Sequence, residues 1–160
     1  AKFPVTNRQF EIIIPRHNRS HIGPEDEHPV VDVTYVEALK FCEVLQLRLP
    51  TEAEWEAAAR GKSNKIAANS DAPDHKMANF WPSKGLNKMG DYPPNDLGLY
   101  DMTGNVYQFT SAKMGNTKLE DIVAIRGGCW GACANGTLVA MRAFMDSMLR
   151  SSRTGFRVAL

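Results

Sequence analysis

A long central stretch, residues 62–97, constrains the fold more than any other part of the 160-residue chain. It has neither a helical nor a strand-like hydrophobic period, and prolines, glycines and asparagines are scattered through it. Loops of this length are uncommon inside compact domains. The stretch is therefore either disordered or part of a fold built around irregular segments. Apolar residues at 78–81, Leu99 and Tyr100 are suited to anchor it, which favours the second alternative.

Three short helices are expected before this stretch, and each begins at a capping box. In each box a threonine is followed three residues later by a residue that can bond back to the cap: Thr6 with Gln9, Thr34 with Glu37, and Thr51 with Glu54. Pro15 ends the first helix. The apolar spacing predicts the other two helices over 34–45 and 51–60.

Short strands are expected after the central stretch, separated by glycines. The candidate segments are 106–110, 122–126, roughly 138–142, and 156–160. Helices followed by an irregular loop and then by short strands are typical of the α+β class. The length fits one domain over 1–160.

Charge and hydropathy exclude several classes of protein. The 19 basic and 18 acidic residues nearly balance, which argues against a general nucleic-acid binder. No apolar run approaches the roughly 20 residues of a membrane span, and no signal segment opens the chain. The odd count of cysteines, with no CxxC pair, argues against a disulfide scaffold or a zinc ribbon: Cys42, Cys129 and Cys133.

The charge is unevenly distributed along the chain. Residues 126–157 carry five arginines and one acid, a net charge of +4, against −3 for the rest. The same segment is rich in large apolar residues: Met141, Phe144, Met145, Met148 and Leu149. Methionine, phenylalanine and arginine on loops suit an adaptable protein-binding surface, and a strand crossing the core would carry them equally well.

Two clusters of polar residues have simpler interpretations than catalysis. Prolines and a glycine interrupt the segment that holds His17, His21 and His28, which favours a solvated loop over a metal site. Three glutamates in residues 52–56 open a predicted helix, where acidic side chains favour the helix dipole. We therefore interpret these glutamates as caps and a solvated face.

Several motifs in order resemble one family. They are PVTNRQF at 4–10, LRLPTEAEWEAAARG at 47–61, NDLGLYDMTGNVYQFT at 95–110, RGGCW at 126–130 and GFR at 155–157. This sequence resembles the formylglycine-generating enzyme (sulfatase-modifying factor) family over nearly its whole length. The resemblance implies an α+β, C-type-lectin-like fold of the formylglycine-generating-enzyme subtype, rich in irregular loops.

The family's oxidases use two cysteines after the GG-S-Trp/Tyr motif to bind copper and turn over a thiol. At the matching spacings this chain has Ala132 and Thr137, while Cys133 lies one position away with no cysteine five residues on. One thiol cannot supply a site made of two thiolates. We therefore expect a protein without enzymatic activity. The alternative is a divergent formylglycine-generating enzyme or a related copper- or iron-dependent oxidase.

The segment at about 126–157 also resembles the variable region of diversity-generating retroelement proteins. In these, a C-type-lectin fold carries a stretch diversified by reverse transcription that mutates adenines. The fixed frame matches at Arg126, Gly127, Gly128, Trp130, Ala134, Ala140, Arg142, Arg150, Gly155, Phe156 and Arg157. The variable-type positions are Gly131, Ala132, Cys133, Asn135, Gly136, Met141, Ala143, Phe144, Met145, Asp146, Leu149, Ser151, Ser152 and Arg153.

This second resemblance implies a binding protein that requires no cofactor. Its ligand would be an unknown protein or cell-surface molecule, not a nucleic acid, and the chain would be displayed on a virus particle or a cell. Arg126 and Arg157 would then be structural. We expect alanine at Phe144, Met145 and Leu149 to weaken binding without unfolding the domain.

The family resemblance also implies a structural calcium site. Its ligands map to Asp101, the backbone of Gly104 and Val106, and Gln108. The last position is normally glutamate, and the neutral amide removes charge on which a calcium site depends.

Overall fold

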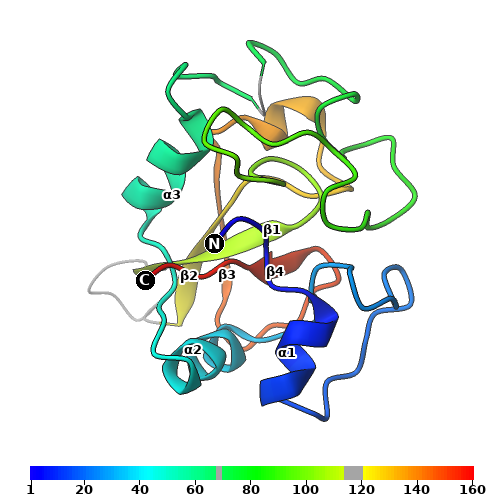
Figure 1. Cartoon of the computed structure of the whole chain (residues 1–160), viewed down its shortest axis with the longest axis vertical. Coiled ribbons are helices and arrows are strands. Elements are labelled where there is room, and N and C mark those ends of the chain that lie inside the picture. Colours follow the sequence, from blue (N-terminus) through cyan, green and yellow to red (C-terminus); the bar gives the residue numbers. More distant parts are fainter. Residues whose placement is uncertain (68–69, 114–120) are drawn as a thin grey trace.

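The computed structural model of the chain describes residues 1–67, 70–113 and 121–160. Its helices come first, an irregular central loop follows, and short strands come last (Figure 1), which confirms the α+β class. The helical elements are α1 (Asn7–Ile13), α2 (Tyr35–Val44), α3 (Glu52–Arg60) and the 3-10 turn η1 (Ala134–Thr137). The strands are β1 (Tyr107–Lys113), β2 (Ile122–Arg126), β3 (Arg142–Asp146) and β4 (Thr154–Phe156).

All three predicted capping boxes are formed. In each, the threonine side chain accepts a hydrogen bond from the third helical N–H, and the third side chain accepts one from the threonine N–H. Gly61 ends α3 at a φ of +63°, in the left-handed region that glycine tolerates. These local signals therefore predict where all three helices begin. The bounds predicted for α2 and α3 agree with the structure to within one residue.

The four strands form one sheet in the order β3-β2-β1-β4. β2 pairs antiparallel with both β1 and β3, and β1 pairs parallel with β4. β3 and β4 therefore form its two edges. In the register, Phe109 lies opposite Ile125 and Phe156, and Val123 lies opposite Met145.

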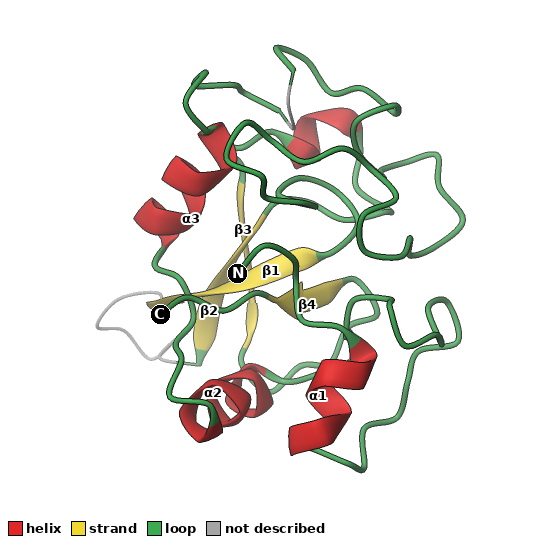
Figure 2. Cartoon of the chain, viewed as in Figure 1, coloured by secondary structure: helices red, strands yellow, loops and turns green. Residues whose placement is uncertain are grey.

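The sheet is covered on both faces. Figure 2 shows α1 and α2 on one side and α3 with the irregular loops on the other. The larger core cluster joins α1 and α2 to the sheet through Phe10, Phe41, Phe109 and Phe156, all 3 % exposed or less. A smaller cluster lies under α3 and contains Trp55, Ala59, Met102 and Val139. None of the helices in the described ranges is long and apolar enough to cross a bilayer.

The central stretch folds as a bonded loop. In its described part, the only ladder contact is an isolated bridge between Ala67 and Ser70. Asparagines tie it to the motif before β1: Asn105 N–H donates to the Asn79 carbonyl at 2.7 Å, and Asn105 Oδ1 accepts from Asn87 N–H at 3.0 Å. Phe80 is buried, which confirms an anchor in residues 78–81.

Two strand predictions need correction. The strand predicted at about 138–142 is wrong, because β3 begins at Arg142 and the preceding residues form a turn in which Met141 N–H donates to the Leu138 carbonyl. Val139 is buried under α3 instead of alternating along a ladder. The last strand is β4, and beyond it only Ala159 makes a bridge, to Arg48.

Candidate functional site

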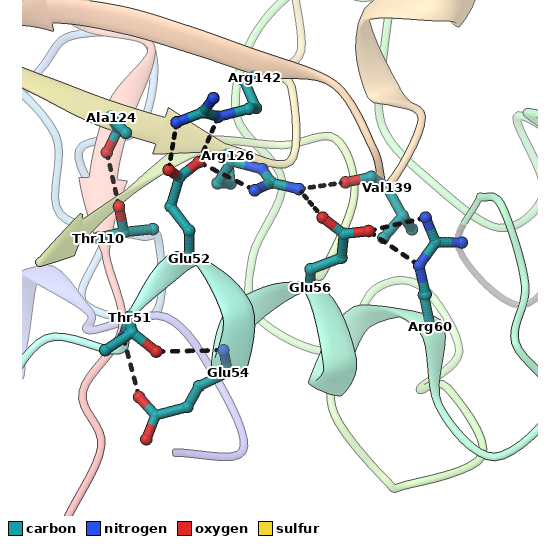
Figure 3. Close-up of polar contacts among 10 residues, drawn as sticks. All are labelled: Thr51, Glu52, Glu54, Glu56, Arg60, Thr110, Ala124, Arg126, Val139 and Arg142. Carbon is teal, nitrogen blue, oxygen red and sulfur yellow. Dashed lines mark hydrogen bonds and ion pairs between the residues drawn. The ribbon is translucent and has the colours of Figure 1, made fainter. Parts of the chain in front are cut away.

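The segment 126–157 is fixed to the domain by buried arginines. Arg126, 2 % exposed, ends β2 and lies against α3. Its guanidinium binds Glu52 at 3.0 Å, Glu56 at 2.7 Å and the Val139 carbonyl at 2.8 Å (Figure 3). It also lies 5.3 Å from the centroid of the Trp55 ring, a cation–π contact. Arg126 is therefore structural, as the sequence indicated.

The three glutamates of α3 all bind arginines, and two of them hold the segment 126–157. Glu54 completes the capping box and binds Arg48. Glu52 and Glu56, four residues apart on one face, both bind Arg126, and Glu52 also binds Arg142. Hydrogen bonds from Arg142 and then Arg126 lower the pKa of Glu52. The expected solvated face is therefore wrong for Glu52 and Glu56, which keep their charge to bind arginines.

The two glycines after Arg126 allow the chain to turn closely over α3. Both have positive φ, +94° at Gly127 and +73° at Gly128. A Cβ on Gly127 would lie 3.0 Å from the Trp55 ring, and one on Gly128 would lie 2.7 Å from the Gly136 carbonyl. The RGG motif is thus a packing requirement of this turn.

Arg157 fixes the other end of the segment. It is 4 % exposed and donates to the Gln108 Oε1 at 2.6 Å and to the Tyr100 carbonyl at 2.6 Å. Burial lowers the pKa of Arg157 to about 10, and the charge of Asp101 opposes this. Like Arg126, this arginine holds the scaffold and does not reach an open site.

The expected calcium ligands do not fit a cation in this arrangement. Gln108 uses its whole amide within the protein: Oε1 accepts from Trp55 and Arg157, and Nε2 donates to the Asp101 carbonyl at 2.6 Å. The Arg157 guanidinium beside Oε1 would repel a divalent ion. Burial raises the pKa of the Asp101 carboxyl to about 6. These contacts of Gln108 and Arg157 do not favour a calcium ion at Asp101, Gly104, Val106 and Gln108.

The variable-type positions are mostly accessible. Of the fourteen, seven are exposed, six are intermediate and one is buried. The buried one is Met145, 8 % exposed, which lies opposite Val123 and belongs to the larger core cluster. The assignment of Met145 to a binding surface is therefore wrong. Its neighbour Phe144 points to the other side of the strand and is 42 % exposed.

The accessible positions form two patches instead of one face. The first, here called the loop patch, adjoins the start of β4 and contains Gly131, Ala132, Cys133, Gly136, Ser152 and Arg153. The Arg153 guanidinium lies 5.2 Å from the centroid of the Trp130 ring, and the Trp130 indole donates to the Ser152 carbonyl at 3.4 Å.

The second, the edge patch, lies on β3 and directly before and after it, and contains Met141, Phe144, Asp146 and Leu149. Because β3 and β4 are opposite edges of the sheet, the two patches lie on different sides of the domain. Of the remaining positions, Asn135 is exposed on η1, Ala143 packs partly against the core, and the Ser151 carbonyl accepts from Asp32 N–H.

Most of the positive charge of the segment is not available to a ligand. Arg126 and Arg157 are buried, and Arg142 and Arg150 form paired hydrogen bonds to Glu52 and Glu37. Arg153 is the remaining arginine, and it lies in the loop patch. Most of the net charge of +4 therefore lies on arginines that hold the scaffold, and little of it forms a basic surface.

One exposed aromatic residue joins the loop patch from outside the segment. Trp81, 61 % exposed, donates its backbone N–H to the Ala132 carbonyl at 2.9 Å. It belongs to the stretch expected to anchor the central loop, so that expectation is wrong for this residue. Sequence reasoning missed Trp81 because nothing local shows that its neighbour in space is Ala132.

The remaining candidates from sequence are single side chains. All three cysteines are free: Cys133 is exposed, while burial raises the pKa of Cys129 and raises that of Cys42 to about 11. His28 is buried and its Nδ1 accepts from Glu25 N–H, so the solvated loop is wrong for this histidine. Within the described ranges, no three His, Cys, Asp or Glu side chains are arranged to hold a metal ion.

Comparisons with known proteins agree with this architecture. The family model of the sulfatase-modifying factor enzyme 1-like domain matches residues 1–160. The solved structure of Treponema denticola variable protein 1 superposes with a TM-score of 0.82 at 20 % identity, covering 98 % of this chain and 82 % of that one. At this identity the likeness establishes the fold alone, which is the expected C-type-lectin-like α+β fold.

Curated relatives include enzymes and an inactive protein. Serine/threonine-protein kinase pkn1 of Chlamydia pneumoniae is 34 % identical over 83 % of this chain and 24 % of its own length. The formylglycine-generating enzyme of Mycobacterium tuberculosis is 37 % identical over 59 % of this chain and 36 % of its own. Inactive C-alpha-formylglycine-generating enzyme 2 of Bos taurus is 33 % identical over 74 % and 44 %.

The chain thus spans a quarter to less than half of the length of these curated relatives. The family model, in contrast, covers it from end to end. The chain belongs to the sulfatase-modifying factor enzyme 1-like family.

Proposed function

We propose that this chain is a non-enzymatic binding protein of the diversity-generating retroelement type, displayed on a virus particle or cell. It would recognise a protein or cell-surface ligand through its C-terminal segment. One observation carries the proposal: eight of the eleven frame positions are buried or held by ion pairs, the exceptions being Trp130, Ala134 and Ala140, whereas thirteen of the fourteen variable-type positions are at least partly accessible. A surface that changes freely needs this separation between scaffold and contact residues.

The loop patch is the better candidate for ligand contact. It combines the exposed Trp81, the Trp130 ring and the Arg153 guanidinium, and tryptophan and arginine are enriched among residues that dominate binding energy. Gly131 and Ala132 next to Trp130 have small side chains, and Trp81 is exposed while Trp130 is partly exposed. Gly128 of the RGG turn lies against Gly136 of this patch, so we expect the turn to hold the backbone of the patch while its side chains change.

Similarity to formylglycine-generating enzymes favours the alternative of a divergent copper- or iron-dependent oxidase. The positions matching the family's cysteine pair hold Ala132 and Thr137, and Thr137 is 1 % exposed. Its hydroxyl donates to the Ala134 carbonyl at 2.7 Å. Cys133 alone presents a thiol to solvent. This geometry supports the binding protein over the oxidase.

The genomic neighbourhood tests the retroelement proposal directly. A near-identical repeat of the codons for residues 126–157, differing only at adenines and lying near a reverse-transcriptase gene, is expected. A locus without such a repeat would overturn the retroelement assignment.

Oxygen consumption with copper and a cysteine-containing sulfatase peptide tests the alternative. We expect none above the rate of copper and peptide alone. Consumption that depends on the chain and disappears in Cys133→Ser would contradict the proposal, and Cys42→Ser, at a buried thiol, is the matched control.

A further inference from the structure

The edge patch has features that the loop patch lacks. In the described sheet, β3 is an edge strand and pairs with β2 alone. Large apolar side chains are exposed on it and beside it: Met141 at 46 %, Phe144 at 42 %, Met148 at 63 % and Leu149 at 55 %. An edge strand with exposed apolar residues is a template for pairing with another strand.

The backbone of β3 is oriented for such pairing. Ser147 N–H donates to the Asp121 carbonyl at 2.6 Å, one step beyond the Asp146–Ile122 pair. Residues of odd number therefore turn their polar groups toward β2, and the N–H and C=O of Arg142 and Phe144 turn outward. No loop or cap hydrogen bond within the described ranges reaches the backbone of these two residues.

The outward face of β3 is complementary to itself. Its side chains on the α3 side are Arg142, Phe144 and Asp146, in the order positive, aromatic, negative. If two such strands pair antiparallel about Phe144, each Arg142 lies opposite Asp146 of the other copy, and the two Phe144 rings meet at the axis. Directly opposite side chains in such pairs are near enough to interact.

Both charged side chains retain an atom for this contact. Arg142 binds Glu52 through Nε and Nη2, which leaves Nη1 without a partner among the described residues. Asp146 accepts from Met148 N–H through Oδ1, and its Oδ2 accepts nothing in the same described ranges. The Arg142 guanidinium also lies 5.1 Å from the centroid of the Phe144 ring, which orders both side chains before association.

We propose that a second copy of this chain binds at β3, so that the two sheets join into one across a two-fold axis. A two-fold interface is made of the same surface on both copies, as the sequence RAFMD permits. The charged ends restrict pairing to this one register, because a shift by two residues places Arg142 opposite Phe144 and leaves the ion pairs unmade. The loop patch stays free on the opposite edge of each sheet.

Sedimentation velocity over a concentration series tests this association. The apparent mass of the wild-type chain is expected to rise with concentration from 17.8 kDa toward twice that value. Asp146→Lys places a lysine opposite each arginine and should weaken dimerisation about tenfold or more. Glu43→Lys, an exposed acid on α2 outside the patch, is the matched control for charge and should leave it unchanged. A mass of 17.8 kDa at all concentrations up to about 1 mM would overturn the proposal.

Cross-linking tests the register, on a Cys133→Ser background that removes the exposed native thiol. Arg142→Cys and Asp146→Cys chains should form disulfide dimers when mixed and much fewer when each is alone, while Phe144→Cys should cross-link with itself. Dimers formed equally well by Met148→Cys, or by each single variant alone, would contradict the pairing about Phe144. Pairing of β3 with a foreign strand instead would appear as a monomer in both experiments and would also overturn the proposal.

Discussion

Neighbouring residues on β3 should respond very differently to truncation. Met145 is 8 % exposed and contributes to the main core, so Met145→Ala removes three heavy atoms from a packed site. Buried methionine-to-alanine changes cost about 2–5 kcal/mol, and a site on an edge strand collapses more easily than the core centre, which gives about 2–3 kcal/mol. Phe144, 42 % exposed, loses mainly its contact with Arg142. We expect Phe144→Ala to cost about 1 kcal/mol or less.

Thermal unfolding of the two variants at one dilute protein concentration measures this difference. For a domain of this size, 1 kcal/mol lowers the Tm by about 2–4 °C, so Met145→Ala should lower it by roughly 5–10 °C and Phe144→Ala by no more than about 4 °C. A slip of β3 by one residue would exchange the two faces and reverse the order. Equal effects, or a larger effect for Phe144→Ala, would refute the register on which both patches depend.

Three further predictions concern the scaffold. Arg126→Met removes the buried guanidinium that binds Glu52, Glu56 and the Val139 carbonyl, and it should cost about 2–3 kcal/mol in urea unfolding, because both glutamates are partly exposed and keep a second arginine. Arg60→Met removes only a partly exposed helix partner of Glu56 and should cost about 0.5 kcal/mol. Similar costs for the two variants would contradict the role of Arg126. Gly128 and Gly98 have nearly the same φ, +73° and +74°, but only at Gly128 would an added Cβ lie close to other atoms. Gly128→Ala should therefore lower the Tm clearly more than Gly98→Ala. Burial raises the pKa of Asp101 to about 6, above its value in the unfolded chain, so protonation of this carboxyl favours the folded state. The free energy of unfolding should therefore rise by about 1 kcal/mol from pH 7 to pH 5, relative to that of Asp101→Asn. Parallel pH profiles of the two proteins would show that this carboxyl is not desolvated.

Local signals in the sequence predicted the helices well. A capping box involves residues three apart, so Thr34 and Glu37 carry all the information that starts α2. The order of predicted helices, irregular loop and strands indicated the α+β class. The motif resemblance supplied the C-type-lectin-like fold, which local periodicity could not have given, because the central loop is held by contacts such as that between Asn79 and Asn105. The prediction of a strand near 138–142 was wrong because Val139 is buried against α3. An apolar run alone does not distinguish a residue buried under a helix from a residue in a sheet.

The candidate site was harder to predict than the fold. The pattern of frame positions correctly predicted that most variable-type positions are accessible. Met145 and Phe144 are both large and apolar, however, and only the strand register decides which one is buried. The division into two patches depends on the strand order, which places β3 and β4 at opposite edges. The pairing of Arg142 with Glu52, ninety residues away, likewise depends on tertiary structure, so the net charge of the segment overstated its basic surface.

Saturation mutagenesis of residues 126–157, selected for resistance to proteolysis, tests most directly whether a fixed scaffold carries a freely variable surface. We expect broad tolerance at the accessible variable-type positions, including Cys133 and Phe144. We expect intolerance at the buried frame, from Arg126 to Gly128 and from Gly155 to Arg157, and at Met145. Equal tolerance at frame and variable-type positions, or broad intolerance at the loop patch, would contradict it.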